Sequence, residues 1–327
     1  MNFGIVGTNF ISDWFVSALP FAEARACAVY SRKRETGDAF ASRHGIPLVF
    51  DDLDEFLTSD AFDAVYIASP NFMHESQCVR ALKAGKHVLC EKPAAPSLAG
   101  YLRVCETARA EGRVYMEAMR TVHDSLWARV KEALPRIGRV RSAQLSFCQY
   151  SSRYDKHRAG EYTNTFNPSL SNAALLDVGI YPIEAAVWLF GTPKAVCGGS
   201  VLLENGFEGA GEAVLAYGEH NVSISYSKVA DALSPSVILG EDGGITVDKT
   251  VMPQAVRLLL RTGEEFLFER EKDGAPNNMH EEIRDFMRAV AAGELLPAHE
   301  TTKDALAVCD SLRRSAGIRF PSDKEDV

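Results

Sequence analysis

The sequence predicts an α/β protein with two domains: a doubly wound, mainly parallel sheet, then an α+β domain with a large, open, mainly antiparallel sheet. Up to about residue 120, strand-like apolar runs alternate with helix-length segments, which is the rhythm of βαβ units. After about residue 135, strand-like runs follow one another without intervening helices, which favours antiparallel pairing. We therefore divide the chain into residues 1–120 and residues 121–327.

In the first domain, apolar runs predict the strands, and the segments between them are long enough for helices. The strands are expected at residues 2–6, 25–30, 47–50, 62–67, 86–90 and 113–116, and the helices at 10–19, 33–44, 53–58, 73–84 and 97–111. Gly45, Gly85 and Gly112 each follow a predicted helix, where a glycine commonly ends one.

The second domain is predicted to begin with a long strand at residues 140–150. A polar stretch with little periodicity, residues 151–172, comes next, followed by a helix at 173–190. Further strands are expected at 195–203, 211–217, 222–227, 237–239, 244–247, 255–260 and 265–269, and closing helices at 279–292 and 302–315.

Composition narrows the class of protein. The chain has 327 residues, enough for two domains with their own cores, and its 46% hydrophobic and 24% charged residues are ordinary for a soluble protein. A net charge of −9 argues against nucleic acid or an anionic membrane as partner. The sequence predicts no basic, apolar leader, and no apolar run in it approaches the roughly 18 residues that span a bilayer. Seven scattered cysteines without CxxC spacing predict a cytoplasmic protein with neither disulfides nor a metal site.

A glycine turn joins the first predicted strand to the first predicted helix. Dinucleotide-binding turns have the pattern G-x-G-x-x-G/A, which lets the backbone approach a pyrophosphate at the helix N-terminus. Gly7 fits the first position, while Asn9 and Ser12 replace the later glycines. Asn tolerates a left-handed backbone better than most residues and Ser is small, so the degraded match is physically permissible. An ordinary βα turn is the alternative. The predicted contacts are Gly7, Thr8, Asn9, Phe10 and Ile11.

The end of the second predicted strand bears on the choice of cofactor. An NAD site usually has an acidic residue about 20 residues beyond the glycines, but this chain has Ser31 followed by three cations. Cations at the start of a helix oppose its dipole, and a 2′-phosphate would offset that repulsion. We therefore predict NADP over NAD, with Ser31 and Arg32 as contacts. A solvated basic patch is the alternative.

Two further strand ends carry polar turns. Ser69, Pro70, Asn71 and His74 follow the fourth predicted strand, beside the glycine turn, and are predicted to contact the nicotinamide side of the cofactor. A capped turn without a ligand is the alternative. Glu91-Lys92-Pro93 follows the fifth predicted strand, and Glu91 and Lys92 are predicted to contact the cofactor. A lysine at this edge can bring a compact positive charge to a hydroxyl that must lose a proton.

Asp177 and Tyr181 are four residues apart, so they share one face of the predicted helix. An Asp within an apolar segment is costly unless it is paired, which makes a hydrogen bond to substrate or to a lysine a reason for its presence. A locally satisfied Asp and a packed Tyr are the alternative. Pro182 removes the helical partner of the Val178 carbonyl, so local distortion is expected.

Together these motifs resemble the glucose–fructose oxidoreductase/inositol dehydrogenase/rhizopine-catabolism (Gfo/Idh/MocA) family along both domains. The resemblance rests on Glu91-Lys92-Pro93, on Ser69-Pro70-Asn71 with His74, and on Asp177, Gly179 and Tyr181. It implies an N-terminal Rossmann domain, a C-terminal domain with an open sheet, and NAD(P)-dependent oxidation or reduction of sugars, cyclitols and related diols. It also implies a role for Lys92 in the reaction, and the peptide before Pro93 is often cis in such proteins.

Two positions depart from the common family pattern. Tyr181 stands where many members carry His, which is similar to the dihydrodiol dehydrogenase branch, where Tyr is the presumed acid–base. The chain has Ser171-Asn172-Ala173-Ala174 where a glycine-rich stretch is common, which puts close approach of the backbone to substrate in doubt. The resemblance also places Arg120 and His123 near the substrate pocket.

The reaction expected from this resemblance is hydride transfer between nicotinamide and a carbon bearing a hydroxyl. Tyr181 would exchange the hydroxyl proton, but a free tyrosine has a pKa of about 10, so a neighbouring ammonium must favour its phenolate. Lys92 would supply that charge, and Asp177 would orient the substrate or Lys92. Because Lys92 and Tyr181 belong to different predicted domains, we expect a cleft between the domains.

Some alternatives stay open from the sequence. A cofactor-sensing regulator with the same fold, or a reductase acting on imines, would use the fold differently. Arg153 and Tyr154, with Lys156 and Arg158, could bind a substrate hydroxyl or carboxylate, although a solvated loop accounts equally well for this segment. The exposed face of the second sheet predicts a homodimer or a higher homo-oligomer.

Overall fold

The computed structural model describes residues 1–294 and 298–324, which form two compact units. The first unit joins Met1–Arg120 to Lys272–His299, and the second joins Thr121–Glu271 to Glu300–Val327. The chain therefore passes from one unit to the other more than once. The alternation of strands and helices in the sequence gives no sign of the return of residues 272–299 to the first unit.

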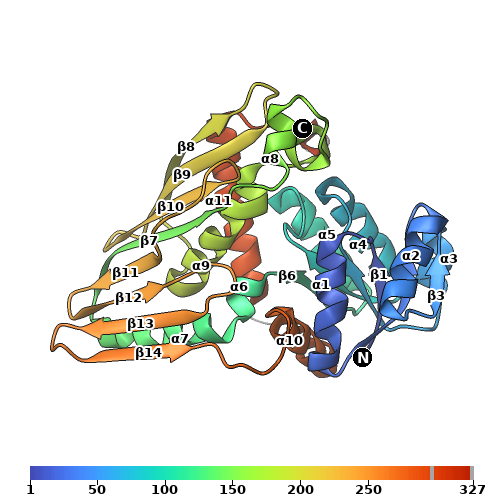
Figure 1. The fold of residues 1–327 in the computed structure, drawn as a ribbon, viewed down its shortest axis with the longest axis horizontal. Coiled ribbons are helices and arrows are strands. Elements are labelled where there is room, and N and C mark those ends of the chain that lie inside the picture. The colour runs from blue at the N-terminus through green and yellow to red at the C-terminus, as the bar shows by residue number, and fades with distance from the viewer. Residues whose placement is uncertain (295–297, 325–327) are drawn as a thin grey trace. The chain divides into compact units, whose positions relative to one another are not determined.

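The sheet of the first unit has the order β3-β2-β1-β4-β5-β6, and all its neighbouring strands are parallel (Figure 1). This confirms the predicted doubly wound sheet. The strands are β1 (Asn2–Val6), β2 (Arg25–Tyr30), β3 (Leu48–Phe50), β4 (Ala64–Ile67), β5 (His87–Glu91) and β6 (Tyr115–Ala118). The helices are α1 (Phe10–Ala18), α2 (Arg34–His44), α3 (Leu53–Thr58), α4 (His74–Lys83), α5 (Leu98–Ala110) and, from the returning segment, α10 (Met279–Ala292).

Helix α10 completes the core of the first unit. The Phe3 ring of β1 lies 5.4 Å from the Phe15 ring of α1 and 5.9 Å from the Phe286 ring of α10, measured between centroids. Met279 and Ile283 are buried in the same cluster because they repeat at helical spacing with Phe286. One face of the parallel sheet is therefore covered by α1 together with a helix from late in the sequence.

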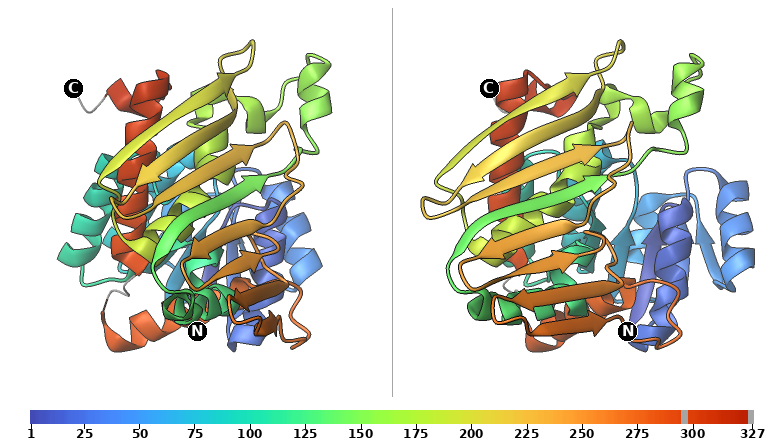
Figure 2. Two further views of the ribbon diagram at one scale, coloured as in Figure 1. Left: turned by 90° about the vertical axis from the view of Figure 1, so that its left-hand side faces the viewer. Right: turned by 60° about the vertical axis from the view of Figure 1, so that its left-hand side comes forward.

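The second unit contains an eight-stranded sheet in the order β14-β13-β12-β11-β7-β10-β9-β8 (Figure 2). Every neighbouring pair is antiparallel except β7 and β10, which confirms the mainly antiparallel prediction. The strands are β7 (Val140–Cys148), β8 (Ala195–Leu202), β9 (Glu208–Ala216), β10 (Asn221–Ser227), β11 (Ser236–Gly240), β12 (Gly243–Val247), β13 (Ala255–Leu260) and β14 (Glu265–Glu269).

Helices cover one face of this sheet. α9 (Ile180–Phe190) packs on β7 and β10, and α7 (Ser125–Ala133) packs on β13 and β14. α11 (Ala298–Ala316) brings the Leu312 side chain within 2.8 Å of where a Cβ on Gly198 would stand. The same Cβ would lie 2.5 Å from the Glu212 backbone oxygen, so β8 needs a glycine there. Figure 2 looks onto the opposite face, over which no helix is drawn.

The predicted helix at 173–190 has an irregular beginning. Residues Leu175–Gly179 form a π-helical turn, and the α-helix α9 follows from Ile180. Pro182 cannot donate a backbone hydrogen bond to the Val178 carbonyl, so the wider turn is the local response. The polar stretch 151–172 also has structure that its sequence does not predict: α8 (Tyr154–Arg158) and the short 3-10 turns Asn164–Phe166 and Pro168–Leu170.

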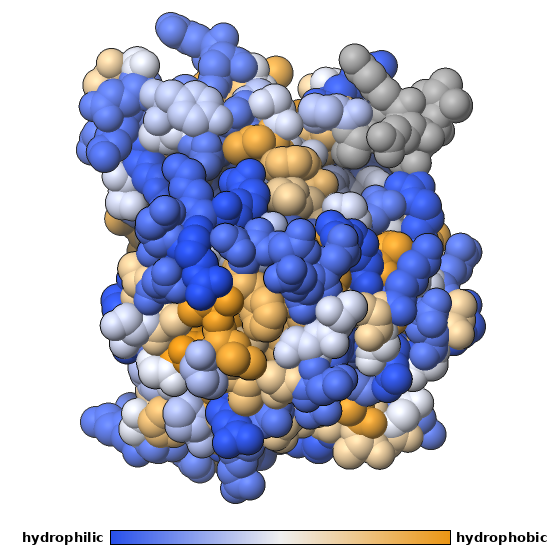
Figure 3. All heavy atoms as spheres, turned by 90° about the vertical axis from the view of Figure 1, so that its right-hand side faces the viewer, coloured by the Kyte–Doolittle hydropathy of each residue, from blue (hydrophilic) through white to orange (hydrophobic). Residues whose placement is uncertain are grey.

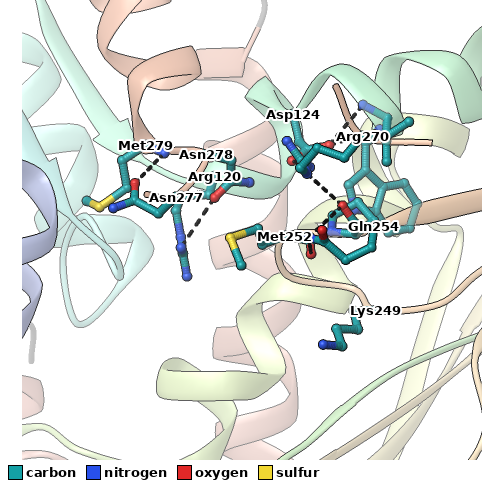
Figure 4. Close-up of polar contacts among 12 residues, drawn as sticks. Arg120, Asp124, Lys249, Met252, Gln254, Arg270, Asn277, Asn278 and Met279 are labelled. Atoms are coloured by element: carbon teal, nitrogen blue, oxygen red, sulfur yellow. Dashed lines mark hydrogen bonds and ion pairs between the residues drawn. The ribbon is translucent and has the colours of Figure 1, made fainter. Parts of the chain in front are cut away.

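Polar contacts fix the chain at two of its three crossings between the units, those after Arg120 and after Glu271 (Figure 4). In the first unit, Arg120 Nη1 donates a hydrogen bond to Asn278 Oδ1 over 3.3 Å. In the second unit, Arg270 forms an ion pair with the buried Asp124, which also caps the N-terminus of α7. Each crossing segment is thus held beside the other crossing segment within the same unit.

Across residues 1–294 and 298–324, none of the helices is long and apolar enough to cross a membrane. Hydrophilic side chains cover most of the face drawn in Figure 3, and apolar side chains gather there only in small groups. The same residues contain no group of three or more His, Cys, Asp or Glu side chains that could hold a metal ion.

Candidate active site

The carboxyl ends of four parallel strands meet at one edge of the first unit. Val6 of β1 is in register with Tyr30 of β2 and with Ile67 of β4, which is in register with Cys90 of β5. The turns that follow these strands therefore begin at the same level, where open α/β sheets bind ligands. Those turns, together with the adjoining ends of β5 and α1, carry the predicted cofactor residues Gly7, Thr8, Asn9, Phe10, Ile11, Ser31, Arg32, Ser69, Pro70, Asn71, Glu91 and Lys92.

The glycine turn after β1 lies against the turn after β4. Gly7 has φ +102°, and a Cβ there would lie 2.6 Å from the Ala68 carbonyl oxygen, so only glycine fits. Asn9 is extended (φ −87°, ψ 178°) rather than left-handed. Its Oδ1 accepts the N–H groups of Ile11 (3.0 Å) and Ser12 (3.3 Å), and its Nδ2 donates to the Ala68 oxygen over 2.8 Å. Asn9 is present here as a helix cap, because capping outweighs the backbone freedom that a glycine would give.

This edge fits a dinucleotide. The buried Ser69 Oγ has no hydrogen-bond partner in the part of the chain that the structure describes, and it follows the strand at the switch point between β1 and β4. Arg32 and Lys33 are exposed, and they form no ion pair with any described residue. An orphaned hydroxyl, the N-terminus of α1 and two uncompensated cations suit a pyrophosphate and a 2′-phosphate.

The turn after β5 positions Lys92. The Lys92–Pro93 peptide bond is cis, and Lys92 is half-buried. Glu91 points into the unit, where its Oε1 accepts a hydrogen bond from the Tyr66 hydroxyl over 2.6 Å. Burial raises the pKa of the Glu91 carboxyl above its ordinary value, against the lowering effect of Tyr66 and Lys92. The hydrogen bond with Tyr66 fixes Glu91, the residue before the turn. A contact between Glu91 and a cofactor stays a prediction.

His74 connects the turns after β4 and β5. Its Nδ1 lies 2.8 Å from the Pro93 carbonyl oxygen, and its Nε2 lies 2.8 Å from the Ser69 carbonyl oxygen. Burial lowers the pKa of the His74 imidazole, although both carbonyls oppose that effect. A neutral ring can donate only one of these hydrogen bonds at a time. The side chain thus holds two loops together, while a direct cofactor contact stays a prediction.

A buried carboxyl from α10 lies in the same unit. Glu282 is fully buried, and neither of its carboxyl oxygens has a hydrogen-bond partner among residues 1–294 and 298–324. Burial raises the pKa of Glu282 well above 4.5, and the nearby Glu91 raises it further, while Arg120 lowers it. The carboxyl therefore favours its neutral form in the folded protein.

Replacing Glu282 with glutamine is expected to flatten the dependence of stability on pH. The folded-state pKa is raised, so the native protein keeps a proton that the unfolded chain releases above 4.5. Native stability must then fall as pH rises from 4.5 towards the folded-state pKa, by up to about 1.4 kcal/mol per pH unit. Urea unfolding should show Glu282→Gln gaining stability relative to the native protein as the pH rises above 4.5. Parallel profiles would contradict this.

In the second unit, the π-helical turn carries Asp177, with Tyr181 one turn later. The Asp177 carboxylate pairs with the Lys228 ammonium, whose side chain is 7% exposed against 37% for Asp177. Tyr181 is buried, and its ring meets the Phe147 ring edge-on, with centroids 5.5 Å apart. The structure therefore pairs Asp177 with a lysine, as one of the two predicted reasons for its presence requires, but this lysine is Lys228 of the same unit, which is not among the residues predicted from the sequence.

Glu208 anchors the start of this turn. Its Oε2 accepts the Leu175 N–H over 2.8 Å, and its Oε1 accepts the Tyr226 hydroxyl over 2.8 Å and the Ser200 hydroxyl over 2.5 Å. Burial raises the pKa of Glu208, while these donors lower it. A Cβ on Gly179 would lie 2.8 Å from the Tyr226 ring, so the far end of the turn is held against the same tyrosine. Asp177 lies between two fixed ends.

The residues predicted to contact substrate have partners of their own. Arg120 contacts Asn278 and lies over the Trp14 ring at 5.5 Å, all within the first unit. In the second unit, Arg153 Nη1 donates to Thr165 Oγ1 over 2.8 Å, and the Tyr154 ring packs 5.5 Å from the Phe166 ring. His123 is half-buried near the start of the second unit. Their contacts with substrate stay predictions.

The motifs of the sequence do not single out Lys228 and Glu282, although both fall on the buried face of the strand or helix to which they belong. Lys228 continues the alternation of the buried Val222, Ile224 and Tyr226, so a lysine falls on the covered face of the sheet. Glu282 falls on the apolar stripe of α10, beside Ile283. A charged side chain that faces the interior needs either an oppositely charged partner or a neutral protonation state. A Lys or Glu at an inward position of the pattern therefore indicates a residue with an unusual environment.

Comparison with known proteins accounts for both units. Residues 1–119 match the model described as "Oxidoreductase family, NAD-binding Rossmann fold", and residues 127–246 match that of the GFO/IDH/MocA C-terminal domain. The chain is 38% identical to scyllo-inositol 2-dehydrogenase (NADP(+)) IolU of Bacillus subtilis, over 99% of both chains. It is 26% identical to trans-1,2-dihydrobenzene-1,2-diol dehydrogenase of Danio rerio, also over 99% of both.

Among solved structures, the fold is similar to KijD10, a 3-ketoreductase from Actinomadura kijaniata, in complex with NADP and TDP-benzene. The TM-score is 0.83 over 98% of both chains, with 23% sequence identity. This likeness concerns the fold.

Proposed function

This chain belongs to the Gfo/Idh/MocA oxidoreductase family, and on that premise we propose that it transfers a hydride between NADP and a hydroxyl-bearing carbon of a cyclitol, sugar or related diol. It is an NAD(P)-dependent dehydrogenase or reductase acting on CH–OH groups. The observation that carries the proposal is the position of Lys92 at the strand edge that also bears the Gly7 turn. The cyclitol comes first because the relative at 38% identity is an inositol dehydrogenase.

The proposed chemistry assigns separate roles to three side chains. Bound NADP would accept or supply the hydride. During oxidation the substrate hydroxyl must lose its proton, and Tyr181 would take it. Lys92 would favour the phenolate and polarise the substrate oxygen. Asp177 would accept a hydrogen bond from a substrate hydroxyl, and the anchored π-helical turn supports this role because it fixes the carboxylate.

A direct assay separates this function from its alternatives. Nicotinamide absorbance is followed while NADP or NAD is offered with inositols, aldoses and vicinal diols, and in the reverse direction with ketones and cyclic imines. Turnover of an inositol or another polyol supports the proposal. Cofactor binding without turnover of any compound would favour the regulator, and turnover of imines alone would favour the imine reductase.

The preference for NADP is proposed to depend on Arg32. Arg32→Ala is expected to weaken NADP binding by about 10- to 100-fold and to change NAD binding little, because only NADP carries the phosphate. Titration of both cofactors by fluorescence measures this. Arg43→Ala is a matched control, because Arg43 lies on the same unit but is already paired with Asp13 at 3.0 Å. An equal loss for both cofactors would contradict the assignment of Arg32.

We also propose that the first unit binds cofactor and that the second unit binds substrate and forms a homodimer or a higher homo-oligomer. Val201, Leu239 and Leu267 are exposed on the face of the sheet that none of the described helices covers. Light scattering that returned the mass of one chain, 35.8 kDa, would overturn this assembly.

The seven free cysteines support a reducing, cytoplasmic compartment.

A further inference from the structure

Lys228 is a buried cation at the end of β10. It continues the inward alternation of that strand after Ile224 and Tyr226, and its side chain is 7% exposed. A buried ammonium is strongly unfavourable unless an opposite charge and hydrogen bonds compensate it. The compensating charge is the Asp177 carboxylate, which is 37% exposed. Within this ion pair, the lysine forms the buried side and the carboxylate forms the accessible side.

The same lysine is connected to the segment 151–172. Its carbonyl oxygen accepts the Ser151 N–H over 2.9 Å, at the beginning of that segment. Its Nζ lies 5.9 Å from the centre of the Phe166 ring, near the end of that segment. Phe166 in turn packs against Tyr154 and His157, with ring centroids 5.5 Å and 5.0 Å apart. The Lys228 side chain therefore joins Asp177 to Phe166, while the Lys228 backbone holds the beginning of the segment at Ser151.

We infer that Lys228 is a positioning residue for the reaction: it holds the Asp177 carboxylate in place as an acceptor for a substrate hydroxyl and aligns the segment 151–172 beside it. The inference rests on the proposed function, because it assumes that Asp177 contacts substrate. Its physical basis is that the lysine is too buried to meet substrate itself. It can act only through the orientation of its partner.

Lys228→Met tests this role, because methionine keeps the length of the side chain and removes the charge. We expect kcat/KM for the polyol substrate to fall by about 10- to 100-fold, as misplacement of a positioning group does. The dissociation constant for NADP should stay unchanged, because the residues proposed to bind NADP belong to the first unit. Lys131→Met is the matched control: Lys131 Nζ donates to the Trp188 carbonyl over 3.0 Å and lies 4.2 Å from its ring, so wild-type kcat/KM is expected.

A double-mutant cycle with Asp177→Asn shows whether Lys228 acts through Asp177. Asp177→Asn should lower kcat/KM, and adding Lys228→Met should then change it by less than about threefold, since residues that act as a unit are not additive. Stability should behave differently. Asp177→Asn leaves the ammonium buried without its carboxylate, so its Tm should fall, and the double variant should recover part of that loss.

Two results would overturn the inference: wild-type kcat/KM in Lys228→Met, or the same loss from Lys228→Met with and without the Asp177 carboxylate. Should Lys228→Met fail to fold, a double variant no more stable than Asp177→Asn also overturns it. Failure of the proposed function is distinguishable, because the wild-type protein would then turn over no polyol, whereas failure of this inference leaves wild-type turnover intact.

Discussion

Tyr181→Phe is expected to lower kcat by about 10²- to 10⁴-fold while NADP binding stays measurable. Phenylalanine keeps the ring and its packing against Phe147 but removes the hydroxyl that would exchange the substrate proton. Lys92→Ala is expected to have an effect of the same size, because the proposed mechanism uses the Lys92 ammonium to favour the phenolate and to polarise the substrate oxygen. Steady-state turnover of the best polyol, beside NADP titration by fluorescence, measures both.

Tyr217→Phe is the matched control for Tyr181. Tyr217 is a buried tyrosine of the same unit, and its hydroxyl has no hydrogen-bond partner within residues 1–294 and 298–324. Removing that hydroxyl should leave kcat near the wild-type value. Near-normal turnover in both Tyr181→Phe and Lys92→Ala would overturn the proposed roles of these residues.

A fragment of residues 1–120 is expected not to fold, whereas the same fragment joined by a short linker to residues 272–299 is expected to fold. Without α10, the core cluster that contains Phe3 and Phe15 loses Met279, Ile283 and Phe286. Burying each such side chain contributes about 1.5–3 kcal/mol, so their sum approaches the 5–15 kcal/mol that typically stabilises a domain. Circular dichroism and urea unfolding distinguish the two fragments.

Within the joined fragment, Phe286→Ala is expected to lower the free energy of unfolding by about 3–5 kcal/mol. This variant separates the contribution of the helix face from that of added chain length. Cooperative unfolding of the 1–120 fragment alone, with stability like that of the joined fragment, would show that α10 is dispensable.

Local patterns predicted the strands and helices well where neighbouring elements also pack together. The parallel sheet follows from alternating strands and helices, and its turns place Gly7 and Lys92 at one edge. Packing between segments that are far apart in the chain is less evident from the sequence. The parallel pairing of β7 with β10 joins strands that are far apart in sequence, so no local pattern encodes it.

Strand β9 begins at Glu208, earlier than predicted, because Gly209 and Gly211 weaken the strand pattern in the sequence. At Gly211, a Cβ would meet the Tyr226 hydroxyl at 2.2 Å.

In the candidate site, too, local patterns indicate some residues, while contacts between distant segments leave no local pattern. The prediction of Asp177 and Tyr181 rests on helical spacing, and that of Lys92 on its position after a strand. No local spacing indicates the contacts of Glu208 and Lys228, since their partners come from other segments of the second unit. The sequence allows Asn9 a left-handed backbone, whereas in the structure Asn9 is extended because its side chain caps α1.

The return of α10 to the first unit has a consequence for how the protein is made. Strand β6 is complete once Ala118 has been synthesised, but α10 begins only at Met279, after the whole eight-stranded sheet. Domains usually complete their folding in order from the N-terminus during synthesis. Here the parallel sheet emerges with part of one apolar face uncovered and must wait for its last helix. The unit that is synthesised first is therefore among the last parts of the chain to become complete.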